Sequence, residues 1–513
     1  MKQQISLLPG ELWWGGQVGA AAQMPYPAST PQIDLHYHLG NQCAPLLLSD
    51  KGRYVWCDHP FRFQFADGQL TVDHPYGDID FSQGHGTLRG AYEAAMGRHF
   101  PPSGKLPAPI NFTVPQYNTW IEFLHNPDQQ KVLKYAHEII EHDMPPGVFM
   151  IDDFWMIDYG NWTFHPGRFP DPKAMMDELH QMGFEVMLWV VPYMSPDNDL
   201  FQYLRRSGML VKPKGSAHPE QVSLRGWWNG ISAIVDYAKP EGRKWFLSSL
   251  NYLVDEYGVG GFKLDAGDAP YPSELPTYQD FVYEGCAHPS DEVESYAALG
   301  MEFPLNELRA GFKLGNQPII WRQGDKPSRW DDAGLGCLIP NAIVQGLMGY
   351  SFNCPDMIGG GLDGNFSDPD FHLDSELYVR WAQLATFMPV MQFSLAPWKA
   401  LKDEELYAVM ECVRLREQMG PEILALAEQS AKDGLPMLRA MNFDHPEMGF
   451  IRDQYMLGED ILVAPVVAKG AQMRTVVFPK GIWQGDDGSI VSGPCSEDVK
   501  APITRLPWYR KIG

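Results

Sequence analysis

Short apolar segments and helix-like segments alternate through the central part of the chain. Apolar stretches with the length of buried strands lie at residues 110–114, 148–152, 186–191, 261–265, 318–321, 350–353 and 390–393. Between most of them, apolar residues recur at helical spacing, as at residues 128–142, 240–257 and 374–387. Such alternation over about 300 residues is typical of a (β/α)8 barrel. No G-x-G-x-x-G follows the first strand, which disfavours the alternative of a doubly wound sheet.

The segments on either side of this alternation have a different pattern. Residues 1–104 contain short apolar stretches broken by turn residues, and a proline-rich linker follows them. Short strands and turns return near the end of the chain, at residues 461–467 and 474–478. The sequence therefore predicts an α/β protein with an N-terminal β-sandwich-like domain over 1–104, a (β/α)8 TIM barrel over 105–430 and a small C-terminal β-domain over 431–513.

Composition and charge exclude several classes of protein. The 513 residues carry a net charge of -24 and no basic stripe, so we expect no nucleic-acid partner. Apolar runs are too short to span a bilayer and no signal peptide is evident, so we expect no membrane partner and a cytoplasmic location. The seven cysteines include no C-x-x-C pair, and His and Cys show no metal-ligand spacing. We expect no metal and no cofactor. The sequence leaves open whether the protein forms a homo-oligomer.

Acidic residues repeatedly occupy the ends of the predicted strands. Asp152 and Asp153 end one strand, and Asp265 ends another. A single aspartate in such a place is often only a helix cap or turn residue, but reactive groups of a (β/α)8 barrel also lie at these strand ends. Lys263 lies two residues before Asp265 and shares its face of the strand, so its charge would lower the pKa of the carboxyl. Asp265 is therefore a candidate nucleophile.

A second group of candidates follows the predicted strand that ends at Trp321. Arg322 comes directly after it, and Trp330, Asp331 and Asp332 follow eight to ten residues later. Adjacent carboxylates disfavour each other's ionisation, which suits a group that must donate a proton. Two carboxylates in different environments are what the cleavage of an acetal requires.

Taken together, these motifs resemble glycoside hydrolase family 31. The matching segments occur in the family's order: Ile-Asp-Asp at 151–153, Phe-Pro-Asp-Pro at 169–172, Phe-Lys-Leu-Asp at 262–265, Arg322, Trp-Asp-Asp at 330–332, Met-Ile-Gly-Gly at 357–360 and Tyr-Met-Leu-Gly-Glu-Asp-Ile-Leu-Val-Ala-Pro-Val at 455–466. The resemblance covers most of the predicted barrel and enters the C-terminal domain. It implies a retaining exo-acting α-glycosidase whose substrate is an oligosaccharide or glycoside with a terminal α-linked sugar.

The resemblance also implies roles for individual residues. Asp265 corresponds to the nucleophile, with Lys263 as its electrostatic neighbour, and Asp332 corresponds to the general acid/base. The stretch after Arg322 is one residue shorter than in relatives, so Asp331 stays an alternative for the acid/base. Further implied substrate-binding residues are Arg322, which would hold sugar hydroxyls, and Asp152 or Asp153, which would bind the remote hydroxyls.

One departure from the family pattern concerns the choice of sugar. Many α-glucosidases of the family have His-Asp-Ile-Gly-Gly where this chain has Asp356 and Met357 before Ile-Gly-Gly. The segment is more similar to the branch of the family that includes myogenesis-regulating glycosidase, which acts on α-galactosides. We therefore expect an α-galactosidase with Asp356 near the sugar, and an α-glucosidase or a transglycosylase is the alternative. Indole rings could stack on the sugar or pack in the core at Trp189, Trp321 and Trp330.

Two other functions remain open from the sequence. A barrel lyase or isomerase could use the acidic strand ends to hold a divalent metal ion. A degenerate glycosidase scaffold could bind carbohydrate without catalysis, although the retention of Asp265 and Asp332 argues against this.

Overall fold

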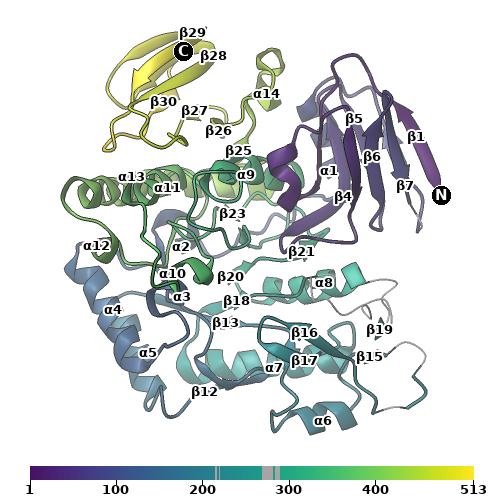
Figure 1. Ribbon diagram of the computed structural model, residues 1–513, viewed down its shortest axis with the longest axis vertical. Coiled ribbons are helices and arrows are strands. Elements are labelled where there is room, and N and C mark those ends of the chain that lie inside the picture. Colours follow the sequence, from purple (N-terminus) through teal and green to yellow (C-terminus); the bar gives the residue numbers. More distant parts are fainter. Residues whose placement is uncertain (75, 214–215, 219, 269–280, 283–288) are drawn as a thin grey trace.

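The computed structural model describes residues 1–513 with the exception of residues 75, 214–215, 219, 269–280 and 283–288. Its central sheet consists of eight parallel strands that follow each other in chain order around a near-closed barrel (Figure 1). These strands are β9 (Gln116–Asn118), β10 (Val148–Ile151), β13 (Glu185–Val190), β18 (Gly261–Leu264), β20 (Leu305–Leu308), β22 (Trp321–Arg322), β23 (Asn353–Cys354) and β24 (Gln392–Phe393). The last strand pairs with the first, and a bridge from Met357 to Gln392 joins the remaining edge. The predicted (β/α)8 barrel is confirmed.

Helices lie around the barrel, and the three that the apolar spacing predicted are present. They are α4 (Gln129–Glu141), α7 (Pro240–Tyr257) and α11 (Ser375–Ala385). Asp128 and Asp374 cap α4 and α11 by accepting hydrogen bonds from backbone N–H groups, and α7 ends at Gly258, which has a left-handed conformation. The other barrel helices are α2 (Ile110–Thr113), α3 (Trp120–Phe123), α5 (Pro172–Gln181), α6 (Phe201–Arg206), α8 (Pro289–Ala297), α9 (Leu338–Leu347), α10 (Asp363–Phe366), α12 (Pro397–Ala400) and α13 (Asp403–Asp433).

The prediction of a strand at 110–114 is wrong, because this segment forms the short helix α2. Ile110 packs against Val148, Met150 and Met187, whose side chains form a separate apolar cluster with Leu305. The first strand is β9, which begins at Gln116 and was not predicted. Strand β20 was also missed. Both strands have buried polar residues, Gln116 and Asn118 in β9 and Asn306 and Glu307 in β20, so neither appears as an apolar run.

The N-terminal part contains two antiparallel sheets, which Figure 1 shows beside the barrel. One consists of β1 (Lys2–Ser6), β7 (Gln69–Asp73), β6 (Arg62–Ala66) and β3 (Thr30–Asp34). The other consists of β2 (Trp13–Gln17), β4 (Gln42–Ser49), β5 (Arg53–Trp56) and β8 (Asp80–Ser82). The barrel segment β21 (Gly311–Phe312) pairs in parallel with β4, and helix α1 (Leu88–His99) follows the sheets. The predicted β-rich domain is therefore tied to the barrel by a shared sheet.

The C-terminal part is a six-stranded antiparallel sheet. Its strands, in spatial order, are β25 (Leu438–Arg439), β26 (Tyr455–Leu457), β27 (Ile461–Val463), β30 (Trp508–Lys511), β28 (Met473–Gly485) and β29 (Ile490–Lys500), with the short helix α14 (Met441–Asp444) beside them. Arg380 of α11 is fully buried and donates hydrogen bonds to carbonyl groups of this part, including that of Ala501 at 2.8 Å. The sheet is therefore held directly on the barrel.

Several loops of the barrel carry small elements. These are β11 (Met156–Asp158), β12 (Asn161–Phe164), β14 (Tyr193–Met194), β15 (Lys212–Pro213), β16 (Leu224–Trp227), β17 (Gly230–Ile234) and β19 (Phe281–Val282). Strands β14, β17 and β16 form one small sheet. No helix in the described residues is long and apolar enough to cross a membrane.

Candidate active site

Asp265 follows the end of β18 and is the centre of a buried group of charges. The indole Nε1 of Trp189, on the neighbouring strand β13, donates to its Oδ2 at 3.0 Å. Nε of Arg309, just after β20, donates to its Oδ1 at 2.8 Å. Burial alone would raise the pKa of this carboxyl, but Arg309, with Lys263 and Arg322, holds it well below its usual range. Asp265 is therefore held as an anion at the end of a barrel strand, as a nucleophile must be.

Lys263 of β18 comes two residues before Asp265, but its hydrogen bond goes to another carboxylate. Its Nζ donates to Oδ2 of Asp152 at 2.7 Å, and both side chains are buried. Burial alone would lower the pKa of Lys263, but the negative charges of Asp152, Asp265 and Glu307 together outweigh this effect, and the pKa lies above its usual value. The ammonium group therefore neutralises Asp152 while its charge still lowers the pKa of Asp265.

The two adjacent carboxylates after β10 have different surroundings. Asp152 accepts a hydrogen bond from the backbone N–H of Asp153 at 2.9 Å and the one from Lys263. Asp153 accepts from the hydroxyl of Tyr159, at 3.0 Å and 3.1 Å from its two oxygens. Burial, with Asp152 nearby, raises the pKa of Asp153 to about 8. One carboxyl of this pair is thus paired with a cation and the other is kept protonated near neutral pH.

The raised pKa of Asp153 leads to a prediction about stability. Between the ordinary aspartate value of about 4 and the raised value of about 8, the folded protein binds more protons than the unfolded chain, so stability falls as the pH rises. Asp153→Asn removes this titration. We expect its melting temperature to exceed that of wild type by a few degrees at about pH 9, and to lie closer to it at about pH 5. Thermal unfolding at both pH values tests this, with Asp158→Asn in the same loop as control. An equal difference at both pH values would contradict it.

Arg322, at the end of β22, joins several carboxylates. Its Nη1 donates to Oδ1 of Asp356 at 2.8 Å and to Oδ1 of Asp325 at 2.6 Å, and its Nε lies 3.3 Å from Oε1 of Glu307. Its Nη2 lies 3.9 Å from Oδ1 of Asp265 and has no hydrogen-bond partner among the described residues. The guanidinium thus lies between the candidate nucleophile and Asp325. Its Nη2 is a buried donor that makes no hydrogen bond to the described residues.

Asp356, two residues after β23, is completely buried and contacts the loop at residues 322–326. Its Oδ1 accepts from Arg322, and its Oδ2 accepts from the backbone N–H of Lys326 at 2.7 Å. Burial raises the pKa of Asp356 to about 6, although Arg322 opposes this shift. The residue has a φ of 69°, an uncommon conformation for a side chain other than glycine. Its observed contacts hold the loop at 322–326.

The three candidate tryptophans have different places. Trp189 contacts Asp265 directly, as described above. Trp321 is buried with its ring 4.9 Å from that of Tyr350, so it packs in the core and points away from the barrel interior that Arg322 faces. Trp330 donates from Nε1 to Oδ2 of Asp374 at 2.9 Å, at the start of α11. Only Trp189 therefore belongs to the group of residues around Asp265.

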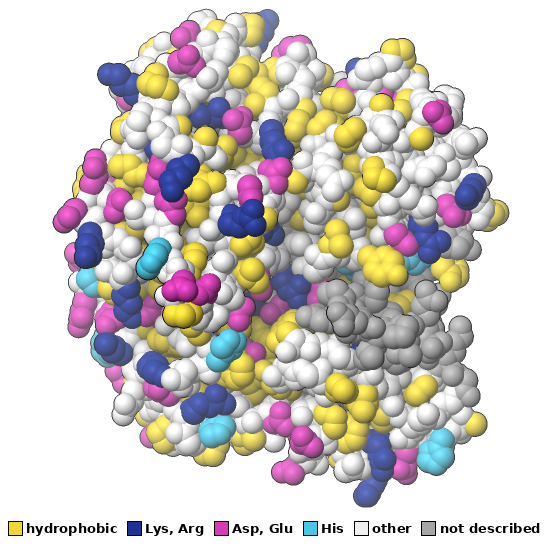
Figure 2. Space-filling model, in the orientation of Figure 1, with side chains coloured by type: hydrophobic (Ala, Val, Ile, Leu, Met, Phe, Trp, Pro, Cys, Tyr) yellow, Lys and Arg dark blue, Asp and Glu magenta, His cyan; other side chains and the backbone are white. Residues whose placement is uncertain are grey.

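A cavity of about 380 Å³ opens beside this group of charges. Its lining residues are Gly19, Ala22, Leu39, Gly40, Asn41, Arg309, Gly324, Asp325, Lys326, Asp332, Ala333, Cys337 and Asn341. The side chain of Asp325 is 36% exposed and is bound to Arg322, whereas that of Asp332 is 56% exposed and is ion-paired with Arg452 of the C-terminal part. Asp331 is ion-paired with Arg329 and does not line the cavity. Acidic and basic side chains are interspersed over the face in Figure 2.

Sequence reasoning missed four charged residues of the site. Glu307 belongs to β20 and Arg309 directly follows it, and that strand was not predicted. Asp268 ends the Asp-Ala-Gly-Asp segment after β18 and accepts from Nη2 of Arg309 at 2.8 Å. Asp325 lies between Arg322 and Trp330, in the segment that is one residue shorter than in relatives. A search for acidic residues within a few positions of every strand end would have found Asp268 and Asp325.

The fold and the site together define a class of protein. A (β/α)8 barrel with a buried, anionic aspartate at a strand end and further carboxylates around an open cavity is the arrangement used by many glycoside-cleaving enzymes. The chain belongs to the glycosyl hydrolases of family 31: the family's TIM-barrel domain matches residues 106–423 and its C-terminal domain matches residues 434–513. The resemblance seen in the sequence motifs is confirmed.

Similar proteins include several enzymes of this family. Myogenesis-regulating glycosidase from Mus musculus is 34% identical, over 77% of this chain and 55% of its own. A 1,3-alpha-isomaltosidase from Kribbella flavida is 28% identical, over 68% of this chain and 51% of its own. The chain thus spans about half the length of these relatives.

Solved structures show the same fold. A dextranase from Flavobacterium johnsoniae complexed with glucose has a TM-score of 0.85 at 19% identity, covering 99% of this chain and 66% of its own. An alpha-xylosidase from a soil metagenome complexed with xylose has a TM-score of 0.85 at 23% identity, covering 99% and 79%.

Proposed function

We propose that the protein is a retaining exo-acting α-glycosidase that hydrolyses terminal α-linked sugars, with Asp265 as nucleophile and Asp332 as general acid/base. The observation that carries the proposal is that Asp265 is held as an anion beside a cavity that Asp332 lines. Arg309, which donates a hydrogen bond to Asp265, lines the same cavity. A retaining enzyme needs one ionised carboxylate and a second one close enough to serve the same bond.

The reaction follows from these two groups in two displacements. A carboxylate oxygen of Asp265 attacks the anomeric carbon while the bond from that carbon to the leaving oxygen breaks, and protonated Asp332 gives its proton to that oxygen. Water then attacks the anomeric carbon, Asp332 takes up a proton from the water, and Asp265 is released. The sugar leaves with its α configuration retained. If an acceptor sugar replaces water, the same steps give transglycosylation.

The choice of Asp332 rests on the Trp-Asp-Asp motif and on the cavity. Asp332 lines the cavity, whereas Asp331 is ion-paired with Arg329 and does not line it. Asp325 also lines the cavity, but its carboxylate is bound to the guanidinium of Arg322, and a general acid must carry a proton. Asp331 and Asp325 remain the alternatives.

We further propose that the substrate is an α-galactoside. What supports this is the sequence of the segment around Asp356, together with the similarity to myogenesis-regulating glycosidase. Asp152 or Asp153 and the group formed by Arg322 and Asp356 are the polar side chains near Asp265 that could distinguish an axial from an equatorial hydroxyl. Relatives named isomaltosidase and alpha-glucosidase favour the second candidate, an α-glucosidase.

A panel of p-nitrophenyl α-glycosides tests both the proposed glycosidase activity and the proposed choice of sugar. We expect kcat/KM for the α-galactoside to exceed that for the α-glucoside by one or more orders of magnitude, because each hydrogen bond lost with the wrong epimer costs about 1–3 kcal/mol. A preference for the α-glucoside, with unchanged selectivity in Asp356→Asn, would point to an α-glucosidase. No turnover of any member, with binding of free sugars retained, would instead indicate a carbohydrate-binding protein.

A further inference from the structure

The wall of the cavity contains a buried ammonium group with unused donors. Lys326 lies in the loop after β22, lines the cavity and is only 7% exposed. Its Nζ donates to the carbonyl of Gly324 at 2.6 Å, and within the described residues it makes no other hydrogen bond and no ion pair. An ammonium group has three donors, and a lysine is almost never buried unless a partner offsets its lost hydration. Two donors of Lys326 therefore lack an acceptor in the described part of the protein.

The backbone of Lys326 is fixed by contacts outside the cavity. Its N–H donates to Oδ2 of Asp356 at 2.7 Å. Its carbonyl accepts from the N–H groups of Gly361 at 3.0 Å and Leu362 at 3.1 Å. None of these three partners lines the cavity, whereas Lys326 does. The side chain of Lys326 therefore forms the wall of the cavity, and it extends from a backbone whose polar groups are already bound.

The cavity lies on the side of the leaving group. It is lined by Asp332, the proposed acid/base, and by Arg309, which contacts the nucleophile. Asp152 and Asp153, the candidates for binding the terminal sugar, do not line it. Because the acid/base must contact the leaving oxygen, the space around it belongs to the group that is released. The volume of about 380 Å³ lies within the range of about 300–1,000 Å³ that is usual for small-molecule sites.

The polar groups of the cavity suit a ligand with many hydroxyl groups. The amide of Asn41 is bound to a backbone N–H of the loop after β22, and the amide of Asn341 donates to Gln323 at 3.0 Å. Lys326 offers donors, and the half-exposed carboxylate of Asp332 offers acceptors. A sugar can use both kinds of group through each hydroxyl, whereas an apolar leaving group would leave the buried ammonium without an acceptor.

We propose that Lys326 binds the leaving sugar: its ammonium group donates hydrogen bonds to hydroxyl groups of the sugar that is released. The residue thereby favours glycosides of sugars over glycosides of small alcohols. The inference rests on the proposed glycosidase activity. It does not depend on which terminal sugar is cleaved, or on which carboxylate of the cavity donates the proton.

The experiment compares two substrates whose leaving groups need protonation equally but differ in hydroxyl groups. They are the disaccharide melibiose and methyl α-galactoside, or isomaltose and methyl α-glucoside if the panel favours glucose. Lys326→Met keeps an unbranched side chain and removes the donors. We expect kcat/KM on the disaccharide to fall by about 10- to 100-fold, the usual effect of a hydrogen bond from a charged donor. On the methyl glycoside it should fall by less than about 3-fold, because methanol offers no further hydroxyl to bind.

Lys239→Met is the matched control. Nζ of Lys239 donates to the carbonyl of Gly208 at 2.8 Å, so this variant also removes a hydrogen bond from a lysine to a glycine carbonyl, but away from the cavity. We expect its ratio of disaccharide to methyl glycoside activity to equal that of wild type. An equal fall on both substrates in a folded Lys326→Met protein would show that Lys326 only supports the loop, and it would overturn the inference, as would no fall on either.

Two further outcomes separate the inference from the proposed function. If the wild-type protein cleaves neither substrate, the proposed function fails and the inference fails with it. If the wild type is active but Lys326→Met does not fold, Lys326→Gln takes its place, because its amide keeps donors and loses the charge. A selective loss of about 3- to 10-fold on the disaccharide then supports the inference, and an unchanged ratio overturns it.

Discussion

Asp265→Ala is expected to reduce turnover by at least about four orders of magnitude while the fold is retained. The variant loses the oxygen that forms the covalent bond to the sugar, and the remaining groups can only bind the substrate. Added azide should restore part of the activity by entering the vacated space and attacking from the same side, so that the product is a β-glycosyl azide. Measured rates with and without azide, and the configuration of the product, check both parts.

Asp171→Ala serves as the control for this variant. Asp171 caps α5 by accepting from the backbone N–H of Ala174 at 3.0 Å. Its loss therefore lowers the stability of α5 and leaves the residues of the site in place. Its turnover should stay near that of wild type. Near-normal activity of a folded Asp265→Ala protein would remove Asp265 from the mechanism.

Asp332→Ala should affect substrates according to their leaving groups. For a disaccharide, whose leaving oxygen needs a proton, we expect kcat/KM to fall by about 100- to 10,000-fold, and for a glycosyl fluoride the fall should be small. Asp325→Ala should lower both rates to a similar extent, because it removes a partner of Arg322 and no proton donor. Both variants are measured on both substrates.

The comparison also includes Asp331→Ala, since the motifs alone leave this residue open. A selective loss on the disaccharide in Asp331→Ala or Asp325→Ala, with Asp332→Ala unaffected, would move the acid/base to that residue. Azide should form an α-glycosyl azide in whichever variant lacks the acid/base, because it then attacks the glycosyl-enzyme in place of water.

The sequence predicted those parts of the fold whose signal is local. Strands such as β13 and β18 are continuous apolar runs, and α4 has apolar residues at helical spacing. Strand β20 was missed because Asn306 and Glu307 are buried inside the barrel, where they bind other polar groups. A polar barrel interior has no pattern that distinguishes it from a loop in a single sequence.

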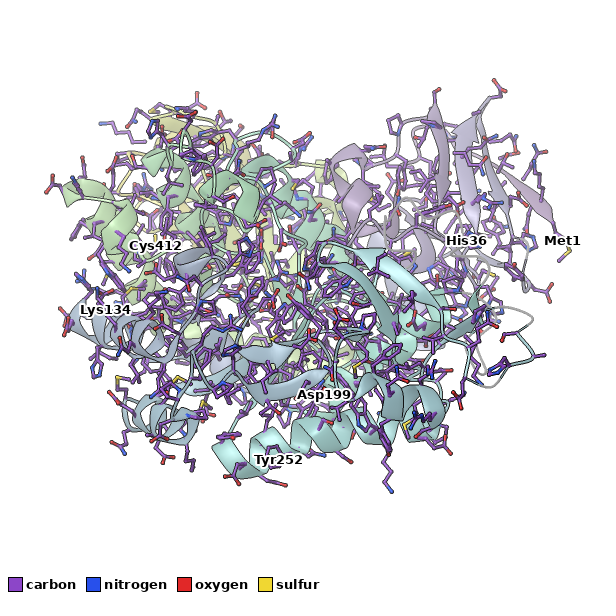
Figure 3. All side chains as sticks on the ribbon, turned by 60° about the horizontal axis from the view of Figure 1, so that its bottom comes forward. Met1, His36, Lys134, Asp199, Tyr252 and Cys412 are labelled. Atoms are coloured by element: carbon purple, nitrogen blue, oxygen red, sulfur yellow. The ribbon has the colours of Figure 1, made fainter. Side chains whose placement is uncertain are left out.

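Only part of the candidate site could be predicted, because the sequence shows relations between residues that are close together in the chain. Asp265 and Lys263 lie two residues apart on one strand, so their relation is visible in the sequence. The contact of Asn41 with Gly324 joins residues 283 positions apart, and the ion pair of Asp332 with Arg452 joins residues 120 positions apart. Contacts of this kind depend on how the three parts of the chain pack, and no motif contains them. Figure 3 shows His36, in the turn after β3, and Lys134 of α4 on opposite sides of the molecule.

The pairing of β21 with β4 has a consequence for the order in which the protein can form during synthesis. Gly311 and Phe312 leave the ribosome well after Gln42 and Cys43, their partners in the sheet. At about 5–20 residues per second, the interval is on the order of tens of seconds. We expect the N-terminal sheets to wait in an incomplete state, with part of the edge of β4 uncovered, until the fifth barrel strand has emerged. Nascent chains stalled before residue 311 should therefore bind chaperones that chains stalled after β21 no longer bind.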